Sequence, residues 1–192
     1  MSGRTPQPNA KLLRSIAYSL DSPPELAPHL DRLFEGLTSL GAMPRRSVAL
    51  LAPFVRAGKA TRVLDAGCGK GAVGVALAKR FGCRVFGFDA YPPFVDAARL
   101  AVDRAGVGSL CRFECETGEG FFARPHRFDA AAMLNLWPVG RASRALRRVV
   151  RPGGVYLIDD ATLDVTHRDA RRFDGVPTPE EATRAVERSG DA

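Results

Sequence analysis

The hydrophobic and polar positions divide the chain into an α-helical first part and an alternating second part. In the first part, "SPPELAPHLDRLFEGLTSLG" carries apolar residues three and four positions apart, which predicts an amphipathic helix over 22–41. Ser22 and Glu25 have the spacing of a capping box at its start. Pro28 fits poorly inside a helix, so the regular part is expected to begin near Ala27. A second helix is expected at about 45–55.

Short apolar strands alternate with helical stretches in the second part. The expected strands are "RVLDA", "RVFGFDA", "LCRFECE", "RFDAAAMLNLW" and "GVYLIDDA", and the expected helices are "AVGVALAKRFG", "FVDAARLAVDRAG", "RASRALRRVV" and a capped helix over 178–190. This alternation predicts an α/β fold, with a doubly wound and mostly parallel sheet of at least five strands and helices on both faces. We divide the chain into an N-terminal helical cap or lid, 1–57, and a sheet-containing core, 58–192.

The stretch "VLDAGCGKGAVG" follows the first expected strand directly. It contains G-x-G-x-x-G, as Gly69, Gly71 and Gly74, which is the pattern of a loop that holds the pyrophosphate of NAD or FAD. Asp65 precedes this loop, and a carboxylate beside a pyrophosphate is unfavourable. The Asp65 carboxylate would instead stabilise a cationic ligand. A tight strand-to-helix turn without a ligand is the remaining alternative.

The second expected strand ends with Asp89, 24 positions after Asp65. A carboxylate there can accept hydrogen bonds from two ribose hydroxyls, or it can simply cap the next helix. Further on, "ALRRVVRPGGVYLID" places a proline and two glycines between a helix and an apolar strand. These residues are expected to stop the helix abruptly and return the chain into the sheet.

These three signals together resemble the class I S-adenosylmethionine (SAM)-dependent methyltransferases, over roughly 62–160. The resemblance implies a Rossmann-like fold and transfer of the SAM methyl group by in-line displacement, with S-adenosylhomocysteine (SAH) as the product. Within this family, the sequence resembles the ubiquinone/menaquinone-biosynthesis-like branch, and this resemblance implies a small-molecule acceptor. An N-P-P-Y-like tetrapeptide is absent after the fourth strand, which disfavours a nucleic-acid base as acceptor.

The resemblance also implies site residues. The cofactor-binding set is expected to comprise Asp65, Gly67, Cys68, Gly69, Gly71, Asp89, Ala90, Tyr91, Glu116, Thr117 and Asn135. The family's usual G-D pair after the third strand is absent, and Glu116 with Thr117 takes its place. Weak catalytic candidates are His167, Asp160 and Asn135, and no metal ion is expected.

For several other residues near the expected site, the sequence allows a functional and a structural interpretation. Asp159 and Asp160 end the fifth strand, where one of them can orient a nucleophile or serve a structural role. Trp137 either lines a substrate pocket or packs beside Pro138. His126 lies in a basic loop and is expected to be exposed and without a role.

The C-terminal part departs from the family. Relatives continue beyond the helix expected over 178–190 with a sixth strand and an antiparallel seventh, whereas this sequence ends there. The missing edge is expected to expose strand four's side of the sheet or another strand, and a homo-oligomer could complete it. A SAM-binding or interaction module without catalysis is therefore the alternative function, and an NAD-dependent oxidoreductase is a remote one.

Composition narrows the class of protein further. The 192 residues are 45% hydrophobic and 26% charged, as in one globular domain, and "MSGRTPQPNAKLLRS" lacks the apolar core of a signal peptide and is interpreted as a loose polar start. We expect a cytoplasmic protein without a membrane span. The four cysteines form no C-x-x-C pair, which argues against zinc. The net charge of +7 comes from scattered arginines, so a solvated surface is favoured over nucleic-acid binding, and an anionic substrate stays open.

Overall fold

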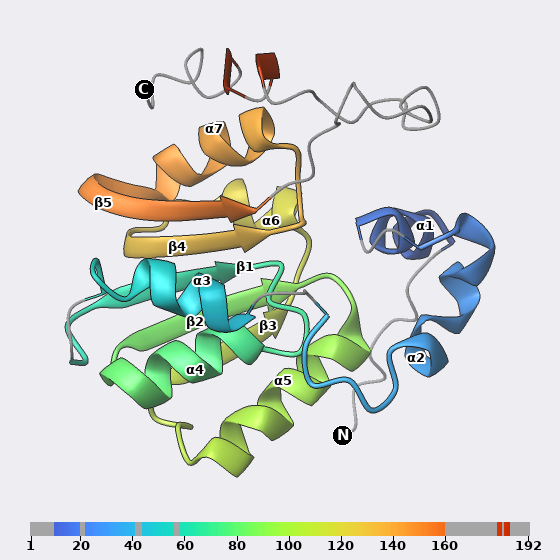
Figure 1. Cartoon of the computed structure of the whole chain (residues 1–192), viewed down its shortest axis with the longest axis horizontal. Coiled ribbons are helices and arrows are strands. Elements are labelled where there is room, and N and C mark those ends of the chain that lie inside the picture. Colours follow the sequence, from blue (N-terminus) through green and yellow to red (C-terminus); the bar gives the residue numbers. More distant parts are fainter. Residues whose placement is uncertain are drawn as a thin grey trace.

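The computed structural model describes residues 10–19, 22–40, 44–55, 58–159, 180–181 and 183–184. Its centre is a five-stranded parallel sheet in the order β3-β2-β1-β4-β5 (Figure 1). The strands are β1 Arg62–Ala66, β2 Arg84–Asp89, β3 Cys111–Cys115, β4 Phe128–Leu134 and β5 Val150–Asp159. The direction of winding reverses between β1 and β4, and ligands of such sheets bind beyond the carboxyl ends of the strands at this point.

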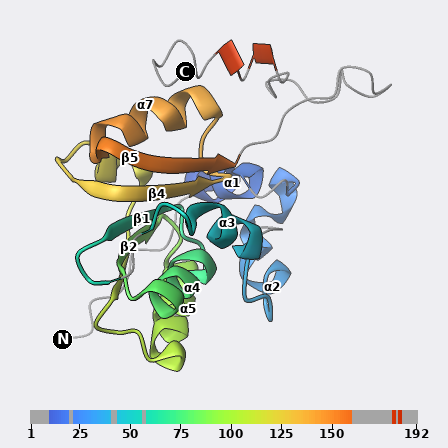
Figure 2. The same cartoon turned by 60° about the vertical axis from the view of Figure 1, so that its left-hand side comes forward.

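Helices cover both faces of the sheet (Figures 1 and 2). One face carries α3 Pro44–Leu51, α4 Ala72–Phe81 and α5 Pro92–Ala105, and the other carries α6 Gly118–Phe122 and α7 Val139–Val149. Successive strand residues point to opposite faces. Val63 accordingly packs with α3, α4 and α5, whereas its neighbour Leu64 packs with α6 and α7. The α/β architecture predicted from the alternating pattern is confirmed.

The N-terminal helices differ from the prediction. Helix α1 Ala10–Ser19 begins within the stretch that was interpreted as a loose start. The long helix expected over 22–41 is a 3₁₀-helix, η1 Pro24–His29, followed by the short α2 Leu30–Leu33. Pro28, which has no N–H to donate, lies inside η1, in agreement with a broken helix. The expected capping box is wrong, because Pro23 is the N-cap and no side chain caps η1.

Smaller differences concern the ends of elements. Helix α3 ends at Leu51, four residues before the expected end, and the short α6 was not predicted. Helix α7 ends at Val149, so the R-P-G-G stretch lies in β5 itself rather than before it. The register between β4 and β5 shifts between Phe128 and Ala130, which accommodates this irregular start of β5.

Strand β5, rather than β4, lies at the edge of the sheet. Strand β4 pairs with β1 on one side and with β5 on the other, so β4 itself is covered and β5 is the outermost strand on its side of the sheet. Of the two expected alternatives, the exposed edge therefore belongs to another strand than strand four. Within the described ranges, no strand pairs with the outer edge of β5. Most of the helix expected over 178–190 lies outside the described residues. Searching the described helices for a membrane span finds none of sufficient length and apolarity.

The N-terminal helices pack beside the carboxyl edge of the sheet. Ile16, Leu30 and neighbouring apolar residues form a separate buried cluster with Tyr91 and Phe94 at the start of α5. Figure 1 shows α1 and α2 beyond the arrowheads of the central strands. This position places the N-terminal part next to the mouth of any site formed by the strand ends.

Candidate functional site

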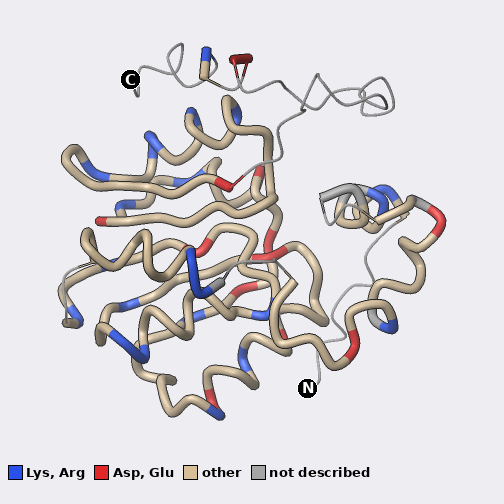
Figure 3. The backbone as a smooth tube through the Cα atoms, in the orientation of Figure 1, with Lys and Arg blue, Asp and Glu red and all other residues tan. Residues whose placement is uncertain are grey.

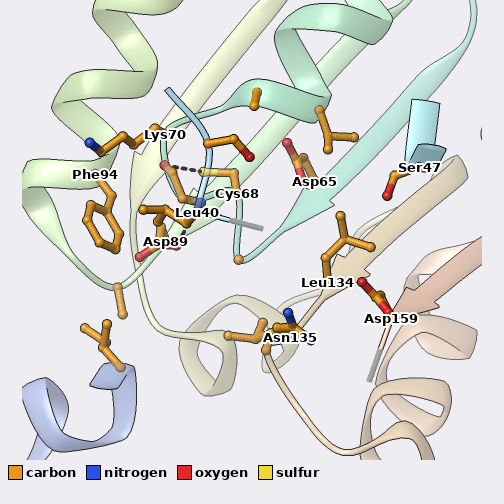
Figure 4. A pocket seen from close by; sticks show the side chains of 18 residues that line it. Leu40, Ser47, Asp65, Cys68, Lys70, Asp89, Phe94, Leu134, Asn135 and Asp159 are labelled. Carbon is orange, nitrogen blue, oxygen red and sulfur yellow. Dashed lines mark hydrogen bonds between the residues drawn. The ribbon is translucent and has the colours of Figure 1, made fainter. Parts of the chain in front are cut away.

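A cavity of about 120 Å³ lies at the carboxyl ends of β1, β2, β4 and β5 (Figure 4). The glycine loop after β1 and Asp89 at the end of β2 form one side. Leu134, Asn135 and Leu136 after β4, with Asp159 at the end of β5, form the other. Residues from the N-terminal part, including Leu40, complete the wall. The cavity therefore occupies the point at which the strand order reverses.

The glycine loop lines the cavity with Gly67, Cys68, Gly69 and Lys70. Gly69 has φ +52°, a left-handed conformation that residues with a Cβ rarely adopt. A Cβ at this position would lie 2.8 Å from Leu40 Cδ1, closer than non-bonded atoms approach. Glycine is therefore required here both by the turn and by the close approach of the neighbouring segment.

Asp89 links the glycine loop to the start of α5. Its Oδ2 accepts a hydrogen bond from Gly69 N–H at 2.9 Å, and its Oδ1 accepts one from Tyr91 N–H at 2.9 Å. Burial raises the pKa of Asp89 to about 6, although the backbone N–H donors oppose this rise. Each carboxylate oxygen can accept more than one hydrogen bond, so Asp89 retains acceptor capacity toward a ligand.

Asp65 lies deeper, below the loop. Its side chain is 4% exposed, and its Oδ2 accepts a hydrogen bond from Gly74 N–H at 2.9 Å in the first turn of α4. Burial raises its pKa to about 7; the Gly74 hydrogen bond lowers it and the nearby Asp89 charge raises it. Burial and these two carboxylates also raise the pKa of the Cys68 thiol, which is therefore a poor nucleophile. Two desolvated carboxylates give the cavity a preference for positive charge.

The opposite side of the cavity contains a strained backbone position. Asn135 has φ +52°, the one positive value among the described residues other than glycine. Its N–H donates to the carbonyl oxygen of Asp159 at 2.9 Å, which joins the ends of β4 and β5. Ser47, buried in α3, lines the cavity near this pair (Figure 4). Strained positions are found mainly at functional sites, so this side is a candidate for acceptor binding.

The predicted cofactor set divides into residues that line the cavity and residues that do not. Those that line it are Asp65, Gly67, Cys68, Gly69, Asp89, Ala90 and Asn135. Outside it, Gly71 packs against Ala98, and the buried Tyr91 ring contacts Phe94. Glu116 forms an ion pair with Arg124, and Thr117 accepts a hydrogen bond from Gly120 N–H as the N-cap of α6. Cofactor contacts by all eleven residues, including the seven that line the cavity, stay predictions.

The remaining candidates lie elsewhere. Trp137 packs against Phe122 and beneath the Arg141 guanidinium, 3.8 Å from its ring centroid, and it does not line the cavity. The expectation that His126 is exposed is wrong: its ring is half-buried and stacks on Phe121 at 4.1 Å. His167 and Asp160 lie outside the described residues.

Sequence reasoning missed the residues that the N-terminal part contributes. Ile16, Ser39, Leu40 and Ser47 line the cavity, as does Lys70 of the glycine loop. No local motif marks the first four, because their place depends on how the N-terminal helices pack against the sheet-containing core: Ile16 and Leu40 lie against the start of α5, and Ser47 lies in α3, which packs against α4 and β5. Asp159, which the sequence analysis placed at the end of the fifth strand but did not include among the catalytic candidates, also lines the cavity.

Two further observations bear on possible partners. Figure 3 shows the lysines and arginines scattered over the described chain rather than gathered in one part of it. Within the described ranges, no three His, Cys, Asp or Glu side chains lie close enough together to hold a metal ion.

Comparison with known proteins agrees with the fold and the motifs. Residues 63–154 match the family described as "Methyltransferase domain". A ubiquinone biosynthesis O-methyltransferase of Methylocella silvestris is 33% identical over 109 residues, which span 55% of this chain and 41% of the relative. The chain thus matches about two fifths of the length of this curated relative.

Among solved structures, a SAM-dependent methyltransferase from Thiobacillus denitrificans in complex with SAH has a TM-score of 0.69 at 20% identity, covering 84% of this chain and 70% of that one. The [4+2]-cyclase SpnF has a TM-score of 0.68 at 20% identity, and the match covers 99% of this chain and 75% of SpnF. At these identities the likeness concerns the fold alone, and the second structure shows that this fold also serves reactions other than methyl transfer. The family match over residues 63–154, the glycine loop and Asp89 together support a class I SAM-dependent methyltransferase.

Proposed function

We propose that this chain binds SAM in the cavity at the strand ends and transfers its methyl group to a small-molecule acceptor. The observation that carries the proposal is the meeting of the Gly69 backbone with two desolvated carboxylates, Asp65 and Asp89, at the switch point of the sheet. A dinucleotide would bring a pyrophosphate to this pair, which is electrostatically unfavourable. SAM carries an ammonium and a sulfonium group, and these positive charges are attracted to the two carboxylates.

The residues present fit this cofactor. Asp89, already oriented by Gly69 N–H and Tyr91 N–H, has the acceptor capacity to bind the two ribose hydroxyls. The Gly69 backbone lets a ligand approach the loop without a side chain in the way. Asp65 lies beneath the loop, where its negative charge stabilises a cationic ligand. When bound, SAM supplies an electrophilic methyl group on a positively charged sulfur.

The acceptor is assigned to the side of the cavity formed by Ser47, Asn135 and Asp159. Methyl transfer requires the nucleophile to lie in line with the methyl group and the leaving sulfur, so alignment is the protein's main contribution. The Asp159 carboxylate and Asn135 can orient a hydroxyl or an amine of the acceptor, while Leu134 and Leu136 contact its apolar part. A proton leaving the nucleophile can pass to Asp159.

Turnover tests the proposal directly. The chain is incubated with SAM and a panel of phenolic, amine and carbon-acid acceptors, and SAH formation is quantified by mass spectrometry. We expect SAH to form with at least one acceptor class. Asp89→Ala is expected to lower turnover at subsaturating SAM by about 100-fold, because it removes a charged hydrogen-bond acceptor.

The matched control is Asp103→Ala on the exposed face of α5, which removes the same charge away from the cavity. It is expected to retain full turnover. Tight SAM binding without SAH formation on any acceptor would instead support the alternative of a catalytically silent SAM-binding module. Binding of NAD in place of SAM would support an oxidoreductase.

A further inference from the structure

We propose that Lys70 is a positioning residue that fastens the N-terminal segment 34–40 over the cavity and thereby controls how firmly the cofactor is retained. Lys70 is part of the glycine loop, yet its side chain points away from the strand ends toward this segment (Figure 4). Its Nζ donates hydrogen bonds to the carbonyl oxygens of Phe34 at 2.5 Å and of Leu37 at 2.7 Å. One side chain therefore joins two parts of the chain that lie more than thirty positions apart in sequence.

The two acceptors explain why a lysine suits this place. Phe34 is the C-cap of α2, and carbonyl groups at the C-terminal end of a helix lack partners within the helix. An ammonium group carries three donors and a charge that complements these carbonyl dipoles. Lys70 is half-buried, so the hydrogen bonds are partly shielded from water. Replacing Lys70 by a residue without a donor leaves the carbonyl groups of Phe34 and Leu37 without these hydrogen bonds.

The segment that Lys70 holds forms part of the cavity wall. Ser39 and Leu40 line the cavity, and Leu40 lies directly over Gly69. Phe34 contacts the Phe94 ring edge-on, with centroids 6.1 Å apart, next to the loop that follows Asp89. The segment thus contacts both sequence motifs of the proposed cofactor site.

Apolar packing of Phe34 and Leu40 also holds this segment, because both pack against the buried cluster that contains Tyr91 and Phe94. Leu37, by contrast, is 51% exposed, so part of the segment's apolar surface faces solvent. A segment that is only partly buried opens more readily than the core, and its closed form depends on individual contacts. We therefore assign the closed position to Lys70 together with the packing of Phe34 and Leu40.

The test compares Lys70→Met with Lys79→Met. Lys79 lies exposed in the last turn of α4, so the control removes the same charge at the far end of the helix that follows the glycine loop. Kd values and dissociation rates for SAM and SAH are measured for each variant. For Lys70→Met we expect both ligands to bind about tenfold more weakly, through faster dissociation, as for loss of hydrogen bonds from a charged donor. Lys79→Met is expected to match the wild type.

Measuring both ligands distinguishes two possible effects of Lys70, namely holding the segment 34–40 in place and repelling a positively charged ligand. SAM carries one more positive charge than SAH, so loss of a cationic side chain that acted only through its charge would tighten SAM and leave SAH unchanged. That outcome would overturn the proposal, as would unchanged binding of both ligands. Tighter binding of both would also overturn it, because the segment would then obstruct the cavity rather than cover its ligand.

The affinity measurement rests on the proposed function, and a second measurement does not. Amide hydrogen exchange in the ligand-free protein is expected to be faster over 34–40 in Lys70→Met than in Lys79→Met, with exchange in α4 and β1 unchanged. Equal exchange in the two variants would contradict the fastening itself. Faster exchange in a protein that binds no SAM would leave the fastening supported and the proposed function refuted.

Discussion

The two sides of the cavity are built from different kinds of segment. The proposed cofactor side comes from one continuous stretch, Asp65 to Tyr91, in which backbone N–H groups of Gly69, Gly74 and Tyr91 hold the two carboxylates. The acceptor side is assembled from α3 and the ends of β4 and β5, with a wall from the N-terminal part. On this side, Asn135 N–H donates a hydrogen bond to the carbonyl oxygen of Asp159 and joins the ends of β4 and β5.

This difference indicates where the two functions can be varied independently. We expect the cofactor side to be rigid, because its hydrogen bonds join the glycine loop, the first turn of α4 and the ends of two paired strands. A site assembled from distant segments can change its lining residues without disturbing the sheet. We therefore expect changes on the cofactor side to alter cofactor affinity and changes on the acceptor side to leave it intact, and the following variants test this in order of their expected effect on that affinity.

Gly69→Ala is expected to have the largest effect of the three. A Cβ there meets Leu40 at 2.8 Å and forces a left-handed conformation that is strained for alanine. We expect SAH affinity to fall by about 30-fold or more, equivalent to about 2 kcal/mol. Gly108→Ala is the control, because its Cβ would project into open space and its φ is not in the left-handed range. Equal affinities of the two variants would show that the loop does not contact the ligand.

Asp65→Asn is expected to have an intermediate effect that depends on pH. Because the pKa of Asp65 is raised to about 7, the wild-type carboxylate becomes charged as the pH rises through 7, and SAM affinity should rise with it. The variant should lack this rise and bind SAM about tenfold more weakly at pH 8, with a smaller loss for SAH, which lacks the sulfonium. A pH profile of Kd identical to that of the wild type would exclude Asp65 as the partner of the cation.

The same variant is expected to change stability in the opposite direction. In the unfolded chain the carboxyl ionises near pH 4, so between about pH 4 and 7 the folded protein holds a proton that the unfolded chain has lost. The folded wild type therefore loses stability as the pH rises through this window. Denaturant unfolding should show ligand-free Asp65→Asn to be more stable than the wild type at pH 8, by about 2 kcal/mol, and no more stable at pH 4.

Asp159→Asn is expected to have the smallest effect on cofactor affinity. The side chain keeps its size and lies on the acceptor side, so SAH affinity should stay within about twofold of the wild type. Turnover of an acceptor that must lose a proton should fall by about tenfold or more. A large loss of SAH affinity would contradict the division of the cavity into two sides.

The cofactor side could be predicted from sequence because its determinants are local. Asp65, Gly67, Gly69 and Asp89 occupy fixed positions after two successive strands, and the carboxyl ends of neighbouring parallel strands meet at one edge. The alternation of strands and helices was sufficient for the sheet and for the helices that cover it. Glycine C-caps at Gly82 and Gly106 ended α4 and α5 at the predicted places.

The N-terminal part could not be predicted in the same way. The periodicity of apolar residues in 22–41 suggested one long helix, but Pro28 interrupts the pattern, and the chain instead forms η1 and α2. Contacts such as Leu40 with Gly69 depend on tertiary packing, for which the sequence carries no local signal. Glu116 was chosen by resemblance, and its ion pair with Arg124 could not be deduced from spacing alone.

The central claim is that the cavity is a SAM site, and calorimetric titration of the wild-type chain with SAM, SAH and NAD tests it most directly. We expect saturable one-to-one binding of SAM and SAH at micromolar concentrations and none of NAD. Failure of the folded chain to bind either SAM or SAH, or saturable binding of NAD, would contradict the account.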